Sequence, residues 1–381
     1  MHATRDPHAG GAVAPAQASQ PVVRRTFVAR AKGFVRHRTR LALDRIDLAL
    51  LSMAARSQFM AKAYYFFASS AFAREQQAVV AGRLHHARRQ ASAGVAAVVM
   101  RRNIHRIEKG LCMVPQREVF ALDYIDETLR AFGNLLTAGQ LADQPLLRYA
   151  HDVLTRYFGV TVWPANARQP REFARLSTQM PADAPLPVRT LAVPAPYEQL
   201  PASDVGYAQF LALVQRRASV RSFESRPVAR HLIDQAVAAA AQAPSACNRH
   251  SLRYVAAADG PIKEQLARLP MGTAGYADDI PVLLAVVGDL SAYPHERDRH
   301  LIYVDASLAN MQFMLALETM GLASCAINWP EMEQRDARIA ELLGLAVFER
   351  VVMLIAVGYP RASGLVPHSE KKSVHEMLSW K

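Results

Sequence analysis

The chain has 381 residues, of which 51% are hydrophobic and 20% charged. This composition excludes a wholly disordered protein, and this length exceeds the usual size of a single core. The net charge of +12 arises at one end, because residues 1–110 carry 19 Lys and Arg against 5 Asp and Glu, whereas the remainder carry 26 and 28. Three cysteines, Cys112, Cys247 and Cys325, are too few and too scattered for a disulfide framework or a zinc cluster. We therefore expect a cytoplasmic protein, peripheral to the inner membrane if its basic arm binds lipid.

The N-terminal arm is basic, and its apolar runs are short. Residues 1–22 are rich in Ala, Gly, Pro and Gln and lack the apolar run of a secretory signal, so we predict a disordered tail. The most apolar stretch, 46–73, contains Arg56 and Lys62 and falls short of the ~20 apolar residues that span a bilayer. The clustered charge predicts contact with an anionic membrane surface or an acidic partner. Nucleic acid is not expected, and a solvated basic helical surface is the alternative.

Residues 23–162 are predicted to form a basic and mainly helical region, because their apolar residues recur at helical spacing. One stretch of this region stands out, in which His105 and Glu108 share a helix face with Arg101 or Arg102. These side chains could form a polar site or an ion-paired seam. Zinc sites use more ligands than this pair supplies, so we expect a structural or interface role and no metal.

The next residues, 163–203, carry eight prolines. Helix interiors and central strands do not tolerate proline, so we predict a linker or a wrapping arm. From residue 204 the sequence alternates between helical and strand-like segments. Helices are predicted at 204–215, from 227, at 301–320 and at 336–343, and strands at 252–257, 281–288 and 351–358. Residues 204–381 are therefore expected to form an α+β domain with a sheet covered by helices.

An arginine-rich segment follows the first of these helices. Arg217, Ser219 and Arg221 place two guanidinium groups and a hydroxyl at alternate positions. Guanidinium groups form charge-assisted and often bidentate hydrogen bonds with phosphate, to which a hydroxyl adds a neutral donor. The segment is a candidate phosphate site, and a solvated surface is the alternative.

A second candidate is the loop 243–251, between a predicted helix and a predicted strand. Its small residues would let the backbone approach a flat ligand, and Ser245 and Asn248 could donate and accept hydrogen bonds at the ligand's polar edge. A simple helix-ending loop is the alternative, because Pro, Ser and Asn are common turn residues.

Three later features follow these two segments in order. They are the stretch 321–329, a helix that ends in Leu342-Leu343-Gly344-Leu345, and an apolar strand that runs into Gly358-Tyr359-Pro360. Together with the Arg-x-Ser-x-Arg and Ala-Pro-Ser-x-x-Asn motifs, they make the chain resemble the FMN-dependent nitroreductase family over about residues 214–381. The resemblance implies a nitroreductase-like mixed sheet flanked by helices.

The resemblance also implies two groups of cofactor-binding residues. The phosphate and ribityl end of FMN would be held by Arg217, Ser219, Arg221, Lys371 and Lys372. The flavin ring would be lined by Pro244, Ser245 and Asn248, commonly from the partner subunit of an entwined homodimer. A backbone N–H near the flavin N5 would come from the loop of Ala326, Ile327 and Asn328.

By the same resemblance, hydride passes from NADH or NADPH to the flavin N5 and then to a planar, conjugated acceptor, with ping-pong kinetics. The sequence departs from the family after Asn248, where Arg249-His250-Ser251-Leu252 replace the usual x-Gln-Pro-Trp. His250 could therefore contact the substrate. The departure keeps an alternative open, a non-catalytic flavin-binding or partner-binding scaffold that acts through its basic arm. The resemblance also suggests a link to bacterial polysaccharide biosynthesis.

Overall fold

The computed structural model describes residues 46–88, 93–139, 144–181 and 192–381. The chain divides into two compact units, Met1–Phe72 and Ala73–Lys381. The predicted disordered tail lies outside the described residues.

The described residues of the first unit are mainly helical. A helix covers 46–54, and α2 (Gln58–Phe67) begins after Ser57, whose side chain caps its N-terminus. Large apolar side chains of this unit are exposed to solvent, including Ile46, Leu48, Phe59, Phe66 and Phe67. None of the described helices in either unit is long and apolar enough to cross a bilayer.

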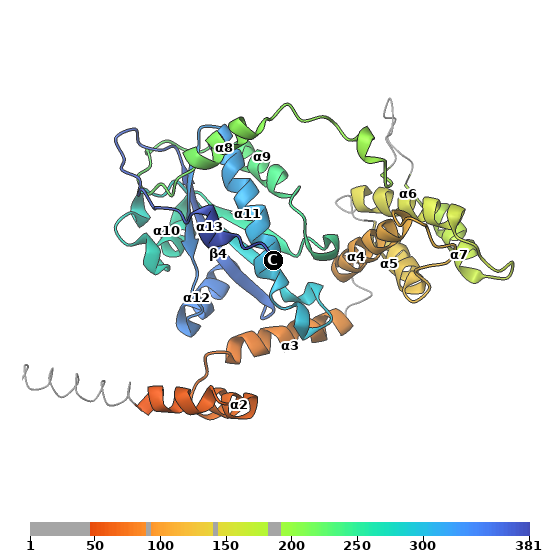
Figure 1. Cartoon of the computed structure of the whole chain (residues 1–381), viewed down its shortest axis with the longest axis horizontal. Helices are drawn as coiled ribbons and strands as arrows, with labels where there is room; N and C mark the ends of the chain where they lie inside the picture. The colour runs from red at the N-terminus through yellow and green to blue at the C-terminus, as the bar shows by residue number, and fades with distance from the viewer. Residues whose placement is uncertain (1–45, 89–92, 140–143, 182–191) are drawn as a thin grey trace, which may run out of the picture. The chain divides into compact units, whose positions relative to one another are not determined.

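A four-stranded antiparallel sheet organises the second unit (Figure 1). Its strands are β1 (Leu252–Ala257), β2 (Val282–Asp289), β3 (Ala323–Asn328) and β4 (Glu349–Gly358), in the spatial order β1-β2-β4-β3. Strand β2 is almost wholly apolar and buried along its length, as expected of a strand covered on both faces. Strands β1 and β3 form the two edges.

Alternate residues of β2 enter two separate cores, because successive side chains of a strand point to opposite faces. Val282, Leu284 and Val286 pack with α9 (Arg230–Ala240) and α11 (Leu301–Thr319). The intervening apolar residues pack on the other face with α10 (Gly260–Arg268) and α12 (Glu333–Leu343). A sheet between two helical layers confirms the predicted α+β class.

The remaining helices of this unit are α3 (Ala73–Arg88), α4 (Ala93–Leu111), α5 (Ile125–Ala138), α6 (Gln144–Val160), α7 (Arg168–Ser177), α8 (Tyr207–Arg216) and α13 (Val374–Met377). Helices α4 to α7 share a core of their own, in which Ile104, Phe132 and Tyr157 are fully buried. This region is helical, as the sequence predicts.

Helix α3 packs closely against the sheet-containing part of the unit. A Cβ atom added to Gly82 would lie 2.9 Å from the backbone of Leu290, so only glycine allows this approach. The buried His86 adds a polar contact, with its Nδ1 2.8 Å from the Ser291 carbonyl. Burial lowers the pKa of His86, which favours the neutral ring that donates this hydrogen bond from Nδ1.

The structure differs from the sequence interpretation in the proline-rich stretch. Helix α7 lies inside the predicted linker, which the number of prolines had seemed to forbid. Pro170 is tolerated because it lies in the first turn of α7, where a backbone N–H has no partner within the helix. The compact units also divide at Phe72 rather than within the linker. The helices and strands predicted after residue 204 are present within a few residues of their expected limits.

Candidate functional site

The arginine-rich segment runs beside the edge strand β3. Helix α8 ends at Arg216, and Ser219 then forms a single parallel bridge with Ser324 of β3. The Val220 N–H donates to the Ser324 carbonyl at 3.1 Å. Backbone pairing therefore holds the segment in place and leaves its side chains available for a ligand.

Two buried polar atoms of this cluster have no hydrogen-bond partner among the residues that the structure describes. They are the Nε of Arg217 and the Oγ of Ser324. Because buried polar groups are seldom left unpaired, water or a bound group would satisfy both atoms. The exposed Arg221 lies in the same segment, with its guanidinium 3.4 Å from the Ser219 carbonyl. Guanidinium and hydroxyl donors of this kind fit the phosphate of FMN.

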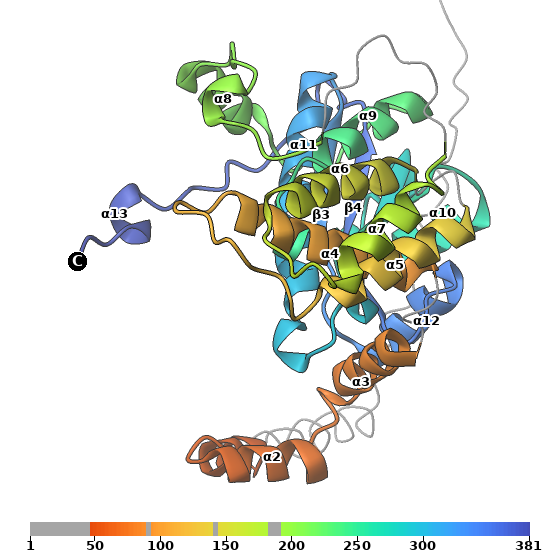
Figure 2. The same cartoon turned by 90° about the vertical axis from the view of Figure 1, so that its right-hand side faces the viewer.

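The predicted lysines lie in an exposed C-terminal arm. Lys371 and Lys372 are both exposed, and the Lys371 ammonium donates to the Ser369 carbonyl at 2.7 Å. Figure 2 shows the arm and its helix α13 extending away from the sheet. A role for these lysines at the phosphate stays a prediction.

The prediction of a loop at Ala326, Ile327 and Asn328 is wrong. These residues end strand β3, where Ile327 is buried and its two neighbours are exposed. The reason is that 323–328 pairs along its whole length with β4, which satisfies its backbone hydrogen bonds as a strand. The contact of these residues with a flavin remains a prediction.

The loop after α9 has a strained backbone. Cys247, Asn248 and His250 have φ angles of 53°, 54° and 49°, in the left-handed region that costs a non-glycine residue roughly 1–2 kcal/mol. Cys247 and Asn248 belong to the short 3-10 helix η3 (Ala246–Asn248). Three such residues within four positions persist only where surrounding contacts fix them, which is common at ligand sites.

A buried carboxylate supplies the main contact. Asp305 of α11 is 3% exposed, and its two oxygens lie 3.0 and 3.1 Å from the Ala246 N–H that donates to them. The Tyr293 hydroxyl is 3.5 Å from the same carboxylate and 2.5 Å from the Ser251 hydroxyl. Both ends of the loop are therefore tied to one carboxylate. Burial raises the pKa of Asp305, and the hydrogen bonds from Ala246 and Tyr293 oppose this rise.

Helices α4 and α6 contact the same loop. Tyr149 of α6 lies beside Asn248 of the loop, and its hydroxyl donates to Glu108 of α4. His105 Nδ1 lies 3.7 Å from the Glu108 carboxylate. His105 and Glu108 thus belong to a polar seam that ends on the loop. In the described part of the chain, no group of three or more side chains is arranged to hold a metal ion.

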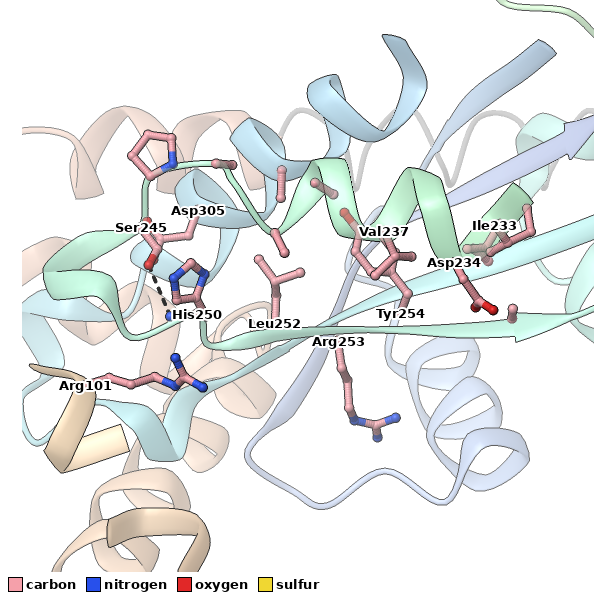
Figure 3. Close-up of a pocket in the computed structure, with 17 residues that line it drawn as sticks. Arg101, Ile233, Asp234, Val237, Ser245, His250, Leu252, Arg253, Tyr254 and Asp305 are labelled. Carbon is pink, nitrogen blue, oxygen red and sulfur yellow. Dashed lines mark hydrogen bonds between the residues drawn. The ribbon is translucent and has the colours of Figure 1, made fainter. Parts of the chain in front are cut away.

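A pocket of about 630 Å³ lies beside this loop, between α9 and β1. Figure 3 shows Ser245 and His250 at one end, with Arg101 of α4 extending toward His250, and Asp234 and Tyr254 toward the other end. The walls between these ends are mainly apolar and include Ile233, Val237, Ala240, Leu252 and Leu284. The volume suits a small molecule, since ligand pockets span about 300–1,000 Å³.

His250 lines this pocket from the position where the sequence departs from the family motif. Its Nε2 lies 2.5 Å from Asn248 Oδ1, and its backbone N–H donates to Ser245 Oγ at 3.1 Å. Burial, and then the charge of Arg101, lower the pKa of His250. The ring is therefore neutral near pH 7 and can act as a hydrogen-bonding group toward a ligand.

The two clusters lie at opposite corners of the sheet. Ser219 pairs near the start of β3, whereas the loop 245–251 leads into the start of β1, at the other edge. Three successive antiparallel pairings make β1 and β3 run in opposite directions, so their starts lie at opposite ends of the sheet. The edges are separated by three strand spacings, about 14 Å. Pro244, Ser245 and His250 thus line a pocket that Arg217, Ser219 and Arg221 do not reach.

Asp305, Tyr293 and Tyr149 were not predicted from the sequence. Asp305 does carry a signal, because an acid on the buried side of an apolar helix needs a partner to offset its loss of solvation. Tyr149 carries none, since its contact with Asn248 depends on how the helices α4 to α7 pack against the loop.

Comparison with known proteins identifies the second half of the chain. The sequence model of the Nitroreductase family matches residues 214–275 and 268–359. Residues 214–359 are a nitroreductase-family domain. Proteins of this family are FMN-dependent oxidoreductases, so the domain is of a flavin oxidoreductase type.

Several relatives resemble this domain at low identity. Iodotyrosine deiodinase of Daphnia pulex is 22% identical in a comparison over 198 residues that covers 45% of this chain and 65% of that protein, slightly less than two thirds of its length. A putative NADH dehydrogenase/NAD(P)H nitroreductase of Archaeoglobus fulgidus is 24% identical over 158 residues, 40% of this chain and 85% of the relative. The crystal structure of a nitroreductase family protein from Streptococcus pneumoniae is 22% identical, with a TM-score of 0.40 over 45% of this chain and all of that one.

Replacing Asp305 by Asn should destabilise the second unit. The substitution keeps the volume of the side chain but turns a charge-assisted hydrogen bond to Ala246 into a neutral one, so we expect the free energy of unfolding to fall by about 1–2 kcal/mol. Urea denaturation followed by circular dichroism measures this change. Asp278→Asn is the matched control, because Asp278 is exposed and forms a surface ion pair with Arg268. Equal effects of the two variants would show that the loop does not depend on Asp305.

Proposed function

We propose that the nitroreductase-family domain binds FMN and uses electrons from NADH or NADPH to reduce a planar, conjugated acceptor. The observation that carries this proposal is the buried Nε of Arg217, unpaired among the described residues and two positions before Ser219, which bridges Ser324 of β3. It lies in the segment where the family motif places the phosphate site. When bound, FMN supplies the hydride chemistry, and the protein supplies position and electrostatics.

Different residues of the chain bind different parts of the cofactor in this proposal. Arg217 and Arg221 bind the phosphate through charge-assisted hydrogen bonds, while the backbone bridge at Ser219 fixes their position on β3. Pro244 and Ser245 present small side chains on the loop after α9, so a flat ring can approach the loop backbone. No protein nucleophile is required.

We further propose that a homodimer brings the two clusters together. Opposite corners of one sheet cannot both contact one flavin within a single chain, whereas one cluster from each of two chains can. The exposed C-terminal arm supports this arrangement, because its apolar side chains Leu365 and Trp380 are 93% and 89% exposed. Such residues favour burial against another surface.

Purified full-length protein should be yellow, or become yellow when FMN is added, and its flavin absorbance should bleach when NADH or NADPH is added without oxygen. Absorbance spectra recorded in an anaerobic cuvette measure both steps. Colourless protein that rejects added FMN would contradict the proposed function. Bound flavin that never bleaches would favour the scaffold alternative, in which the fold keeps its cofactor without turnover.

Arg217→Ala should weaken FMN binding by about tenfold or more, because it removes a charged hydrogen-bonding partner of the phosphate. Fluorescence quenching of FMN during titration with the variant gives its dissociation constant. Arg216→Ala is the matched control, since the adjacent Arg216 is largely exposed and pairs with Glu318 at 3.4 Å. Equal FMN affinity in the two variants would exclude the phosphate assignment.

We also propose that the first unit binds an anionic membrane surface. The first 72 residues carry 11 Lys and Arg and 3 Asp and Glu, and the described helices expose Phe59, Phe66 and Phe67 at 80%, 80% and 84%. Basic charge attracts anionic lipid, and exposed aromatic side chains can insert into the interface.

Full-length protein should therefore sediment with vesicles that contain phosphatidylserine, and deletion of residues 1–40 should reduce the binding constant by about tenfold or more, because each basic residue near the surface contributes roughly 1 kcal/mol. Vesicles of phosphatidylcholine alone are the control. Equal sedimentation with and without residues 1–40 would contradict the membrane proposal. Binding to DNA without binding to the vesicles would also contradict it.

A further inference from the structure

The pocket between α9 and β1 contains a cation that does not belong to the nitroreductase-family domain. Arg101 comes from α4, yet it lines the pocket together with Ser245 and His250 (Figure 3). Among the described residues it has no hydrogen-bond or ion-pair partner. The adjacent Arg102 instead pairs with Glu127 at 2.5 Å. Two consecutive arginines therefore have different roles, and Arg101 is the one that faces the pocket.

The other charges that line the pocket are already compensated or distant. Arg253 forms an ion pair with Glu349 at 2.9 Å. The Asp305 carboxylate accepts from the Ala246 N–H and lies near the Tyr293 hydroxyl. Asp234 lies toward the far end of the pocket from Arg101 (Figure 3). The end formed by Arg101, Ser245 and His250 therefore offers one guanidinium without a partner among the described residues and the hydroxyl of Ser245 as donors, while the only nearby carboxylate in the lining, Asp305, is engaged by the Ala246 N–H.

The position of Arg101 is fixed by the docking of α4 on the loop. Glu108, two turns further along α4, accepts a hydrogen bond from Tyr149, which lies beside Asn248 of the loop. Asn103 is fully buried, and its amide donates to Glu127 at 2.9 Å. A helix held at several points cannot easily turn Arg101 away from the pocket, so the guanidinium is preorganised for a ligand.

We propose that this pocket binds a small apolar molecule that carries one anionic group, a carboxylate or a phosphate. The anion binds Arg101 at the Ser245–His250 end, and the apolar part lies between α9 and β1 against Val237 and Leu252. This inference deepens the proposed function by naming the class of the electron acceptor. The role of this molecule as an electron acceptor rests on the proposed function. Its binding to the pocket does not, because binding requires no flavin chemistry.

The test compares two probes of equal ring size, naphthoate and the neutral naphthalenemethanol. Their binding to the full chain is measured by naphthalene fluorescence at equilibrium, without NADH. The wild type should bind naphthoate more tightly, and Arg101→Gln should weaken naphthoate by about tenfold or more while changing naphthalenemethanol by less than about twofold. Arg101→Lys should restore part of the naphthoate affinity. Arg156→Gln, an exposed arginine on α6, is the charge-matched control and should leave both affinities unchanged.

A second variant locates the probes within the protein. Val237→Phe fills the apolar part of the pocket, so it should weaken both probes alike. Unchanged binding of both probes in Val237→Phe would overturn the proposal, and so would equal loss of both in Arg101→Gln or failure of the wild type to prefer naphthoate. Circular dichroism and the midpoint of thermal unfolding show whether each variant is folded.

Turnover separates this inference from the proposed function. With naphthoquinone sulfonate as acceptor, Arg101→Gln should raise KM relative to the KM for unsubstituted naphthoquinone. Binding of naphthoate through Arg101 in a protein that reduces neither quinone would support the anion site and overturn the reductase. Reduction of both quinones with the same KM ratio in wild type and Arg101→Gln would support the reductase and overturn the anion site.

Discussion

The pocket depends on the contact between the Asp305 carboxylate and the Ala246 N–H. Three left-handed residues follow this point, and each would relax toward an ordinary backbone if the loop were free. The carboxylate is buried, so its hydrogen bonds act in a medium where they are strong and where their loss would leave a charge uncompensated. The loop conformation places His250 and Ser245 at one end of the pocket, and through Asn248 it also meets the helices α4 and α6. One contact thus organises both the pocket and its junction with the N-terminal helices.

The antiparallel sheet imposes a second constraint on function. Residues at the starts of β1 and β3 are kept apart by the width and the length of the sheet. The segment with Arg217 and the loop with Ser245 are each well formed, but within one chain they lie too far apart to contact the same ligand. A second copy of the chain resolves this conflict without any change of fold, and this is why the proposed function and the proposed dimer depend on each other.

An element could be predicted from the sequence where the residues that determine it lie within the element itself. Strand β1 and helix α11 could be predicted within a residue or so, because a short apolar run and a long apolar stretch without Gly or Pro are signals that lie within the segments themselves. The loop expected at Ala326–Asn328 was wrong because its strand character comes from pairing with β4, a partner that is distant in sequence. Helix α7 was not anticipated because proline was counted without regard to its position in a turn. Phosphate-binding candidates could be named from a motif, whereas the contacts of Tyr149 and Asp305 arise from tertiary packing alone.

The contact between helix α4 and the sheet domain bears on the role of the basic N-terminal region. Its net charge suggests a single electrostatic role, yet its arginines differ in what they contact. Arg102 stabilises the helical region through Glu127, and Arg101 faces a pocket whose remaining walls belong to the sheet domain. The family motif usually places Gln-Pro-Trp where this chain has His250-Ser251-Leu252, next to the point that Arg101 approaches. The replaced motif residues and the guanidinium of Arg101 lie at the same end of one pocket, and this placement supports the proposed anionic ligand.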